Sequence, residues 1–329
     1  MKCRPLLQSA AALGIAAVFT ALSGFVGFAG FAILATPADA APAPRKRIGV
    51  SLLSQSHQFY RDLEDAIRSE AKNRDFDLVI SYGEFDHVRQ AEQIQSFIDK
   101  RVDALLIAPC NSNEVGVGIE IANRARIPVF TVDIANKSGR GQVVSHVASD
   151  NYDGGLKAGA LMAEALGGRG KVVIINHPGV ASVMERVRGF KDCVAQYPGL
   201  EIVSDIPGWG QRDRAMSIME DLLLMYPEVD GVFAINDDSA MEAVTAIDAT
   251  RHPRRIVAVG YDGTEDARRA IKAGKIYGDV VQYPRTIGEL VARTIASHFA
   301  GKPVEPEIRV GVQVIGASGL WGSEDAGLE

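Results

Sequence analysis

The chain has 329 residues, 47% of them apolar, so it is long enough for two domains and can bury a sizeable core. Its formal net charge is -6, and no basic cluster stands out. These features argue against binding to nucleic acid or to an anionic membrane surface, because both need a face rich in lysine and arginine.

The N-terminal segment has the composition of a secretory signal. Lys2 and Arg4 precede an apolar stretch that ends in the A-x-A motif of residues 38–40. This pattern predicts a signal peptide over residues 1–40, with export and cleavage after Ala40. The apolar stretch is also long enough to span a bilayer, so an uncleaved membrane anchor is the alternative.

After a linker rich in proline and alanine at residues 41–44, short apolar runs alternate with segments of helical spacing. Short apolar runs predict buried strands, and apolar residues three or four positions apart predict helices. We expect strands at 48–53, 76–83, 102–109 and 127–133, and helices at 60–74, 87–100 and 113–125.

The second half repeats this alternation. We expect strands at 171–177, 200–209, 229–237, 255–262 and 278–284, with helices at 183–194 and 211–226 and after each of the strands that end at 237 and 262. VDALLIAP and VDGVFAIND occupy equivalent places in the two halves, as do IPVFTVD and RIVAVGYD. The chain is therefore predicted to be an α/β protein with two similar doubly wound lobes, each with a mostly parallel sheet covered by helices on both faces.

Polar residues stand at the carboxyl ends of several predicted strands, where open α/β sheets bind ligands. These strand ends, together with aromatic residues in the loops, give the candidates Asp133, Asn236, Asp237, Asp238, Asp262, Phe59, Tyr60 and Trp209. Carboxylates and amides bond hydroxyl groups, and aromatic faces stack on the C–H faces of a sugar ring. The set indicates a polyhydroxylated ligand.

Helix capping is the alternative role for the acidic residues, because Asp and Asn often accept the free N–H groups at a helix start. We expect Asp238 to cap the following helix and Asn236 to face the ligand, and for Asp237 both roles remain possible.

Cys110 and Cys193 are expected to be buried free thiols, with a disulfide as the alternative. Neither has the neighbours of a metal site, and no cofactor is predicted.

Several motifs then occur in the order typical of one family. VVSHVASDNYDGG, INDDSAMEAV, VAVGYDGT and VVQYP follow one another within residues 46–315. This part of the chain resembles the ribose-binding-protein group of type I periplasmic binding proteins. The resemblance implies two lobes joined by a three-stranded hinge, a sugar in the cleft between them, and recognition of the closed form by the permease and ATPase of an ABC importer.

The resemblance also implies the boundaries of the lobes. The crossovers fall near Ser149/Asp150, Gln282/Tyr283 and Gly311/Val312. The N-terminal lobe is then 45–149 plus 283–311, and the C-terminal lobe is 150–282 plus 312–329.

Matching the family's motifs residue by residue implies a set of ligand-binding residues. Phe59 and Tyr60 would stack on one face of the sugar and Trp209 on the other. The polar members would be Asp133, Arg186, Asn236, Asp262 and Gln282, and His57 and Asp237 are possible additions. A surface ion pair with Glu185 is the alternative role for Arg186.

The first lobe departs from the family's pattern at three positions. His57 stands where ribose binders carry asparagine, Ala108 stands where asparagine is frequent, and Ile134 stands where arginine is frequent. A missing polar contact to a buried hydroxyl costs about 1–3 kcal/mol. We therefore expect a deoxy sugar, a polyol or another pentose in place of ribose.

The expected function is a periplasmic solute-binding protein without catalytic activity. A periplasmic sensor that hands a sugar-like signal to a chemoreceptor or sensor kinase is the alternative. A transcriptional regulator with the same lobes is disfavoured, because a signal-like segment stands in place of a helix-turn-helix. An enzyme is disfavoured because no catalytic triad motif, P-loop or metal-ligand spacing accompanies the paired carboxylates.

Overall fold

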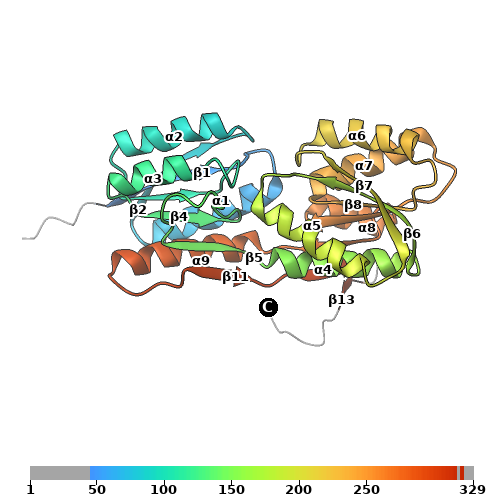
Figure 1. The fold of residues 1–329 in the computed structure, drawn as a ribbon. Coiled ribbons are helices and arrows are strands. Elements are labelled where there is room, and N and C mark those ends of the chain that lie inside the picture. Colours follow the sequence, from blue (N-terminus) through green and yellow to red (C-terminus); the bar gives the residue numbers. More distant parts are fainter. Residues whose placement is uncertain (1–44, 317–318, 322–329) are drawn as a thin grey trace, which may run out of the picture. The chain divides into compact units, whose positions relative to one another are not determined.

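Figure 1 shows the computed structural model of the chain, which describes residues 45–316 and 319–321. The predicted signal peptide at 1–40, the linker at 41–44 and the final residues 322–329 of the predicted C-terminal lobe lie outside the described residues. None of the helices in the described part of the chain is long and apolar enough to cross a membrane.

The first lobe contains a sheet of six strands, and every neighbouring pair in it is parallel. In spatial order the strands are β11 (Glu307–Val310), β5 (Ser145–Ser149), β4 (Val129–Val132), β3 (Ala104–Ile107), β1 (Lys46–Leu52) and β2 (Phe76–Tyr82).

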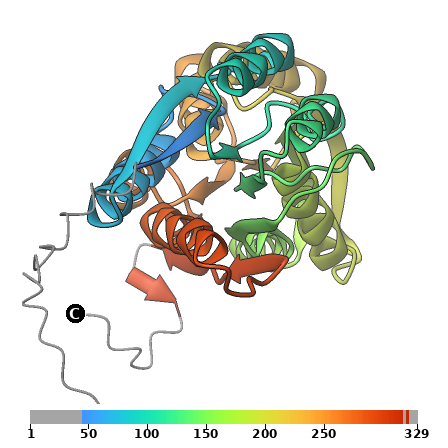
Figure 2. The same ribbon diagram turned by 90° about the vertical axis from the view of Figure 1, so that its left-hand side faces the viewer.

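Helices cover both faces of this first sheet. They are α1 (Gln58–Asn73), α2 (His87–Asp99), α3 (Gly116–Arg124) and α9 (Pro284–Phe299). Neighbouring residues of β3 point to opposite faces, as in any strand. Leu106 packs in the apolar cluster that contains residues of α1 and α9, and Leu105 packs in the one that contains residues of α2 and α3. Figure 2 shows α9 (red) beside α1 (blue), although more than 200 residues separate them in the chain.

The second lobe contains a sheet of seven strands. In spatial order they are β13 (Gly319–Trp321), β12 (Gln313–Gly316), β10 (Gly278–Val281), β9 (Val257–Asp262), β8 (Gly231–Ala234), β6 (Arg169–Asn176) and β7 (Gly199–Pro207). All pairs are parallel except those of β12 with β10 and β13. The predicted fold class of two α/β lobes is confirmed.

The described residues of the second lobe form five helices: α4 (Asn151–Ala165), α5 (Ala181–Val194), α6 (Arg212–Met225), α7 (Asp237–Thr250) and α8 (Glu265–Lys272). α4 packs closely on α5 because glycines line the contact. A side chain at Gly155 would come within 2.1 Å of the Arg186 carbonyl oxygen, and one at Gly189 within 2.2 Å of the Tyr152 carbonyl oxygen. This close approach fixes the position of α5, which carries Arg186.

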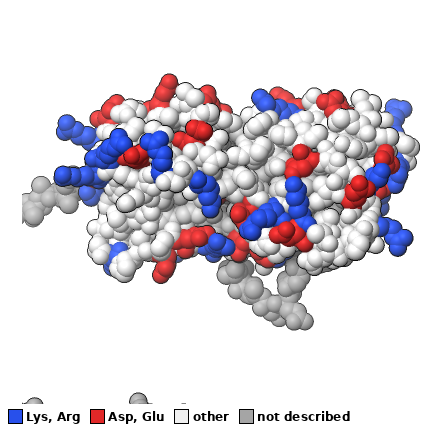
Figure 3. All heavy atoms as spheres, in the orientation of Figure 1, with Lys and Arg blue, Asp and Glu red and all other residues white. Residues whose placement is uncertain are grey.

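The chain passes between the two sheets three times: from β5 to α4, from β10 to α9, and from β11 to β12. Each sheet is therefore built from segments that are distant in the sequence. Lys/Arg and Asp/Glu side chains are interspersed on the face shown in Figure 3, without a large patch of one sign.

Candidate functional site

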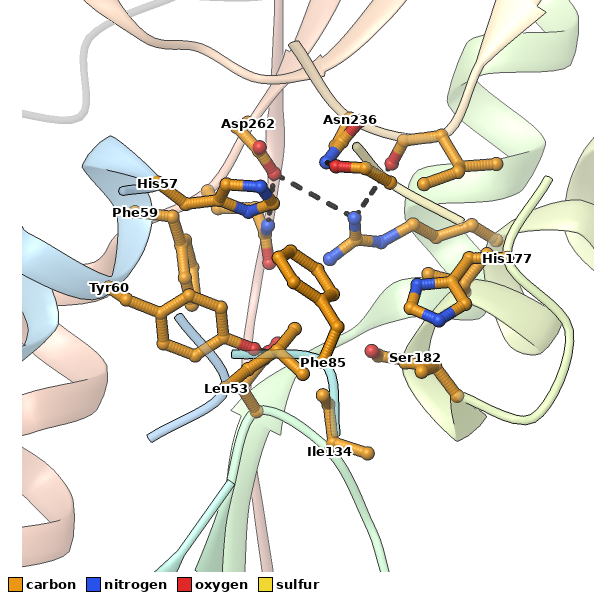
Figure 4. Close-up of a pocket in the computed structure, with 17 residues that line it drawn as sticks. Leu53, His57, Phe59, Tyr60, Phe85, Ile134, His177, Ser182, Asn236 and Asp262 are labelled. Carbon is orange, nitrogen blue, oxygen red and sulfur yellow. Dashed lines mark hydrogen bonds and ion pairs between the residues drawn. The ribbon is translucent and has the colours of Figure 1, made fainter. Parts of the chain in front are cut away.

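A cavity lies between the two lobes, at the carboxyl ends of their strands (Figure 4). Its empty space is about 390 Å³, part of which is open to solvent. The lining residues are Leu53, His57, Phe59, Tyr60, Phe85, Asp133, Ile134, His177, Val180, Ser182, Val183, Arg186, Gly210, Ile235, Asn236, Asp262 and Gln282. Eight of the ten residues that the sequence nominated line it, and Trp209 and Asp237 do not.

On the first-lobe side, Tyr60 and Asp133 form one hydrogen-bonded unit. The Tyr60 hydroxyl donates to Asp133 Oδ2 at 2.5 Å, and both side chains are buried. Burial raises the pKa of Tyr60, and the negative charge of Asp133 raises it further. Asp133 Oδ1 is buried without a hydrogen-bond partner among the described residues. That oxygen is available to accept a bond from a ligand.

Arg186 is buried, with 4% of its surface exposed, and it does not form the surface ion pair with Glu185 that was the alternative. Its Nε donates to Asn151 Oδ1 and its Nη1 to the Ile235 carbonyl oxygen, both at 2.8 Å. Its guanidinium also lies over the Tyr261 ring, 3.9 Å from the centroid. These contacts hold the guanidinium rigidly against the cavity.

Asp262 and Gln282 are joined where β9 and β10 end. Gln282 Nε2 donates to Asp262 Oδ1 at 2.7 Å, and Arg186 Nη1 lies 3.7 Å from the same oxygen. Burial raises the pKa of Asp262 well above its usual value, while the positive charge of Arg186 acts in the opposite direction. Gln282 Oε1 is buried without a partner in the described part of the chain.

The structure corrects the predicted cap of α7. Asn236, and not Asp238, is the N-cap, and its Oδ1 accepts from the Ser239 N–H at 3.0 Å. Asn236 also lines the cavity, so it has both of the roles that the sequence analysis separated. Asp238 lies in the first turn of α7 and pairs with His57 and Arg212.

Asp237 points away from the cavity into the second lobe. It accepts from the Thr264 N–H at 2.7 Å and meets Asp279 beside Gly260. A side chain at Gly260 would come within 2.7 Å of Asp279 Oδ2 and 2.8 Å of Asp237 Oδ1. Burial raises the pKa of both carboxyls, that of Asp279 to about 6. Asp237 therefore makes its contacts within the second lobe and does not line the cavity.

Sequence reasoning missed Phe85 and His177. Phe85 lies between β2 and α2 in the first lobe, and His177 follows β6 in the second. Their ring centroids are 6.2 Å apart. Trp209, expected to stack on the ligand, is 38% exposed and packs behind His177 with 5.7 Å between the ring centroids. Burial lowers the pKa of His177 to about 4, so this ring is neutral at pH 7.

Apolar side chains form another part of the lining. Leu53 and Ile134 come from the first lobe, and Val180 and Val183 from the second. All four belong to one buried apolar cluster. Ile134 therefore gives the cavity an apolar surface where arginine is frequent in the family that the sequence resembles.

Cys110 and Cys193 are buried free thiols, as expected. Within residues 45–316 and 319–321, no group of three or more His, Cys, Asp and Glu residues could hold a metal ion.

Comparisons with known proteins agree with this geometry. The family model of the periplasmic binding protein domain matches residues 48–303. The ribose import binding protein of Bacillus subtilis is 33% identical over 275 residues, which are 83% of this chain and 88% of that protein. The xylitol-binding protein of Mycolicibacterium smegmatis is 30% identical over 246 residues, which are 74% of this chain and 69% of that protein.

A similar solved structure is an ABC transporter solute binding protein from Agrobacterium vitis, bound with α-D-tagatopyranose. It is 27% identical, superposes with a TM-score of 0.79, and is matched over 83% of this chain and 95% of that one.

Proposed function

Because the chain belongs to the periplasmic binding protein family, we propose that it is the solute-binding subunit of an ABC importer and captures a monosaccharide or a related polyol between its lobes. The names of its relatives support this proposal, since they bind ribose, xylitol and a tagatopyranose. The resemblance expected from the motifs is confirmed by the family match.

The observation that carries the proposal is a pair of unsatisfied acceptors in the interlobe cavity. Asp133 Oδ1 and Gln282 Oε1 are buried there, and neither has a partner among the described residues. A buried polar atom without a partner costs about 1–3 kcal/mol, so both favour a ligand that donates hydroxyl groups. Phe59 supplies an apolar face beside them.

The residues proposed to contact the ligand are those predicted polar and aromatic residues that line the cavity: Phe59, Tyr60, Asp133, Arg186, Asn236, Asp262 and Gln282, with His57 beside them. Phe85 and His177 join this set. Trp209 does not line the cavity, but its ring packs against the ring of His177.

The proposed partners are the permease and ATPase of the importer, and the proposed location is the periplasm. Phe59, Asp133 and Asp262 then serve recognition, and the protein releases its ligand unchanged. The paired carboxylates Asp237 and Asp238, which an enzyme could use as acid and base, do not line the cavity.

A thermal-shift screen of the purified protein tests this function. The panel contains pentoses, hexoses, deoxy sugars and polyols. A ligand that binds only the folded protein raises the unfolding midpoint by mass action. We expect at least one compound of the panel to raise the midpoint in proportion to the logarithm of its concentration. If none does so at millimolar concentration, the proposed ligand class is wrong.

A further inference from the structure

We propose that two polar contacts across the cleft form a clasp that stabilises the closed form of the protein. One contact joins His57 to Asp238, and the other joins Ser112 to Gly179 and Ala181. This inference rests on the proposed function, in which the lobes close over a ligand. It assigns a positioning role to Ser112 and Asp238, neither of which lines the cavity.

The first contact of the clasp uses an acceptor that the second lobe holds in place. His57 immediately precedes α1 in the first lobe, and its Nε2 lies 3.1 Å from Asp238 Oδ2 in α7. The other oxygen of Asp238 is 2.6 Å from Arg212 Nη2, and Arg212 Nη1 is 3.0 Å from Glu242 Oε1. Only His57 comes from the first lobe, so this bond requires the lobes to be closed.

The second contact caps a helix from the opposite lobe. Ser112 lies between β3 and α3 and is 2% exposed. Its N–H donates to the Gly179 carbonyl oxygen at 2.9 Å, and its Oγ accepts from the Ala181 N–H at 2.9 Å. The first N–H groups of a helix have no partner within the helix. Val180, the residue at the N-cap of α5, provides no side-chain cap, and Ser112 supplies one across the cleft.

Both contacts connect closure to residues that line the cavity. α5, which Ser112 caps, also carries Arg186. His57 lines the cavity itself, and its ring lies edge-on to Phe85 with 5.2 Å between the centroids. Closure therefore fixes the start of α5 in the second lobe and the position of His57 in the first lobe at the same time. A ligand favours the closed form only through contacts that the open form lacks, and the clasp stabilises the closed form independently of the ligand.

The test measures the distance between the lobes directly. Spin labels at Val88→Cys in α2 and Leu224→Cys in α6 report it, because both positions are exposed, at 58% and 82%. Cys110 and Cys193 are buried, which favours labelling at the introduced sites, and Cys3 is replaced by serine in every labelled chain.

In the labelled full chain, Ser112→Ala removes the bond from the Ala181 N–H and leaves the backbone bond to Gly179, and Asp238→Ala removes the bond to His57. Glu242→Ala is the matched control, because it removes a carboxylate partner of Arg212 and leaves the bond between His57 and Asp238.

We expect both clasp variants to shift the distance distribution towards the open form, with and without ligand, while the control matches the parent. The hit from the thermal-shift panel should dissociate about tenfold faster from each clasp variant, as expected for loss of one or two hydrogen bonds. The unfolding midpoints without ligand show whether the variants are folded.

Distance distributions that are the same in the parent and in both clasp variants would overturn the clasp. If the parent binds no compound of the panel, the proposed function fails on its own, and the ligand-free distributions still decide for or against the clasp.

Discussion

Asp262 combines backbone strain with a central place in the site. Its φ is 132°, in a region that L-residues other than glycine rarely adopt. Such residues cost about 1–3 kcal/mol and persist where the surrounding structure holds them. Here the surrounding structure is Gln282, whose side chain and backbone N–H both donate to Asp262, and the Arg186 guanidinium. The strain places a carboxylate at the edge of the cavity.

Replacing this carboxylate should weaken ligand binding strongly without unfolding the protein. We expect Asp262→Ala to weaken affinity for the panel hit by about 100-fold, because a hydrogen bond to a charged group contributes about 1.5–3 kcal/mol. Isothermal titration calorimetry measures the effect. Asp221→Ala, at an exposed position of α6, is the control and should bind like the parent. Unchanged affinity of Asp262→Ala would remove Asp262 from the site.

The apolar lining leads to a prediction about ligand choice. A hydroxyl placed against Leu53, Ile134 and Val180 would lose its bonds to water and gain none from these side chains. We expect a deoxy sugar, a polyol or a pentose other than ribose to bind at least about tenfold more tightly than ribose. Competition between ribose and each panel compound measures the ratio, and ribose as the tightest ligand would contradict it.

The residues that sequence reasoning missed depend on loop conformation. Phe85 has a φ of 63°, and His177 lies between a strand and a turn, so neither shows a periodic pattern. Trp209 was chosen for its aromatic ring, yet its φ of 58° belongs to a turn that leaves the ring behind His177. The cap of α7 was misassigned because Asn236, Asp237 and Asp238 are equally suited to capping by residue type.

At the scale of elements, β9 and β10 and the start of α7 bury a pair of carboxyl groups. Asp279 in β10 is fully buried, and Asp237 meets it from the first turn of α7. Burial raises the pKa of Asp279 from 3.8 to about 6. The folded protein therefore binds this proton more tightly than the unfolded chain does. The resulting stability is complete below pH 3.8 and is lost as the pH rises to about 6.

The variant Asp279→Asn should remove this pH dependence. An amide carries no charge and can donate to Asp237, so we expect a gain in unfolding free energy of up to about 3 kcal/mol at pH 7.5, where the parent has lost its contribution. The gain should shrink towards zero near pH 4. Urea unfolding of both proteins across this range measures it, with the exposed Asp99→Asn as control. A gain that does not vary with pH would contradict the explanation.

Most elements of the fold follow from the spacing of apolar residues. The predicted helices at 60–74, 87–100 and 211–226 are observed within two residues at each end. α4 was not predicted, because Gly154, Gly155 and Gly159 hide its helical pattern. Those glycines serve the close contact with α5, which becomes evident only once both helices are placed.

For the whole molecule, ligand binding should reduce the radius of gyration. The clasp joins the lobes directly, and the ligand site contains residues of both. Small-angle scattering with the panel hit at saturation measures the change, and a compound that gave no thermal shift is the control. A profile that does not change at saturation would contradict lobe closure as the binding step.

The three passages of the chain between the sheets have a consequence for the order of folding. β5 pairs with β11 through His146 and Glu307, so the first sheet acquires its edge strand only after β6 to β10 of the second lobe have been made. α1 likewise is covered only after α9 has been made. Contacts between such distant segments form slowly, because a long loop must close first. The first lobe thus stays incomplete until α9 and β11 are available, and this delay would keep the chain unfolded for the proposed export to the periplasm.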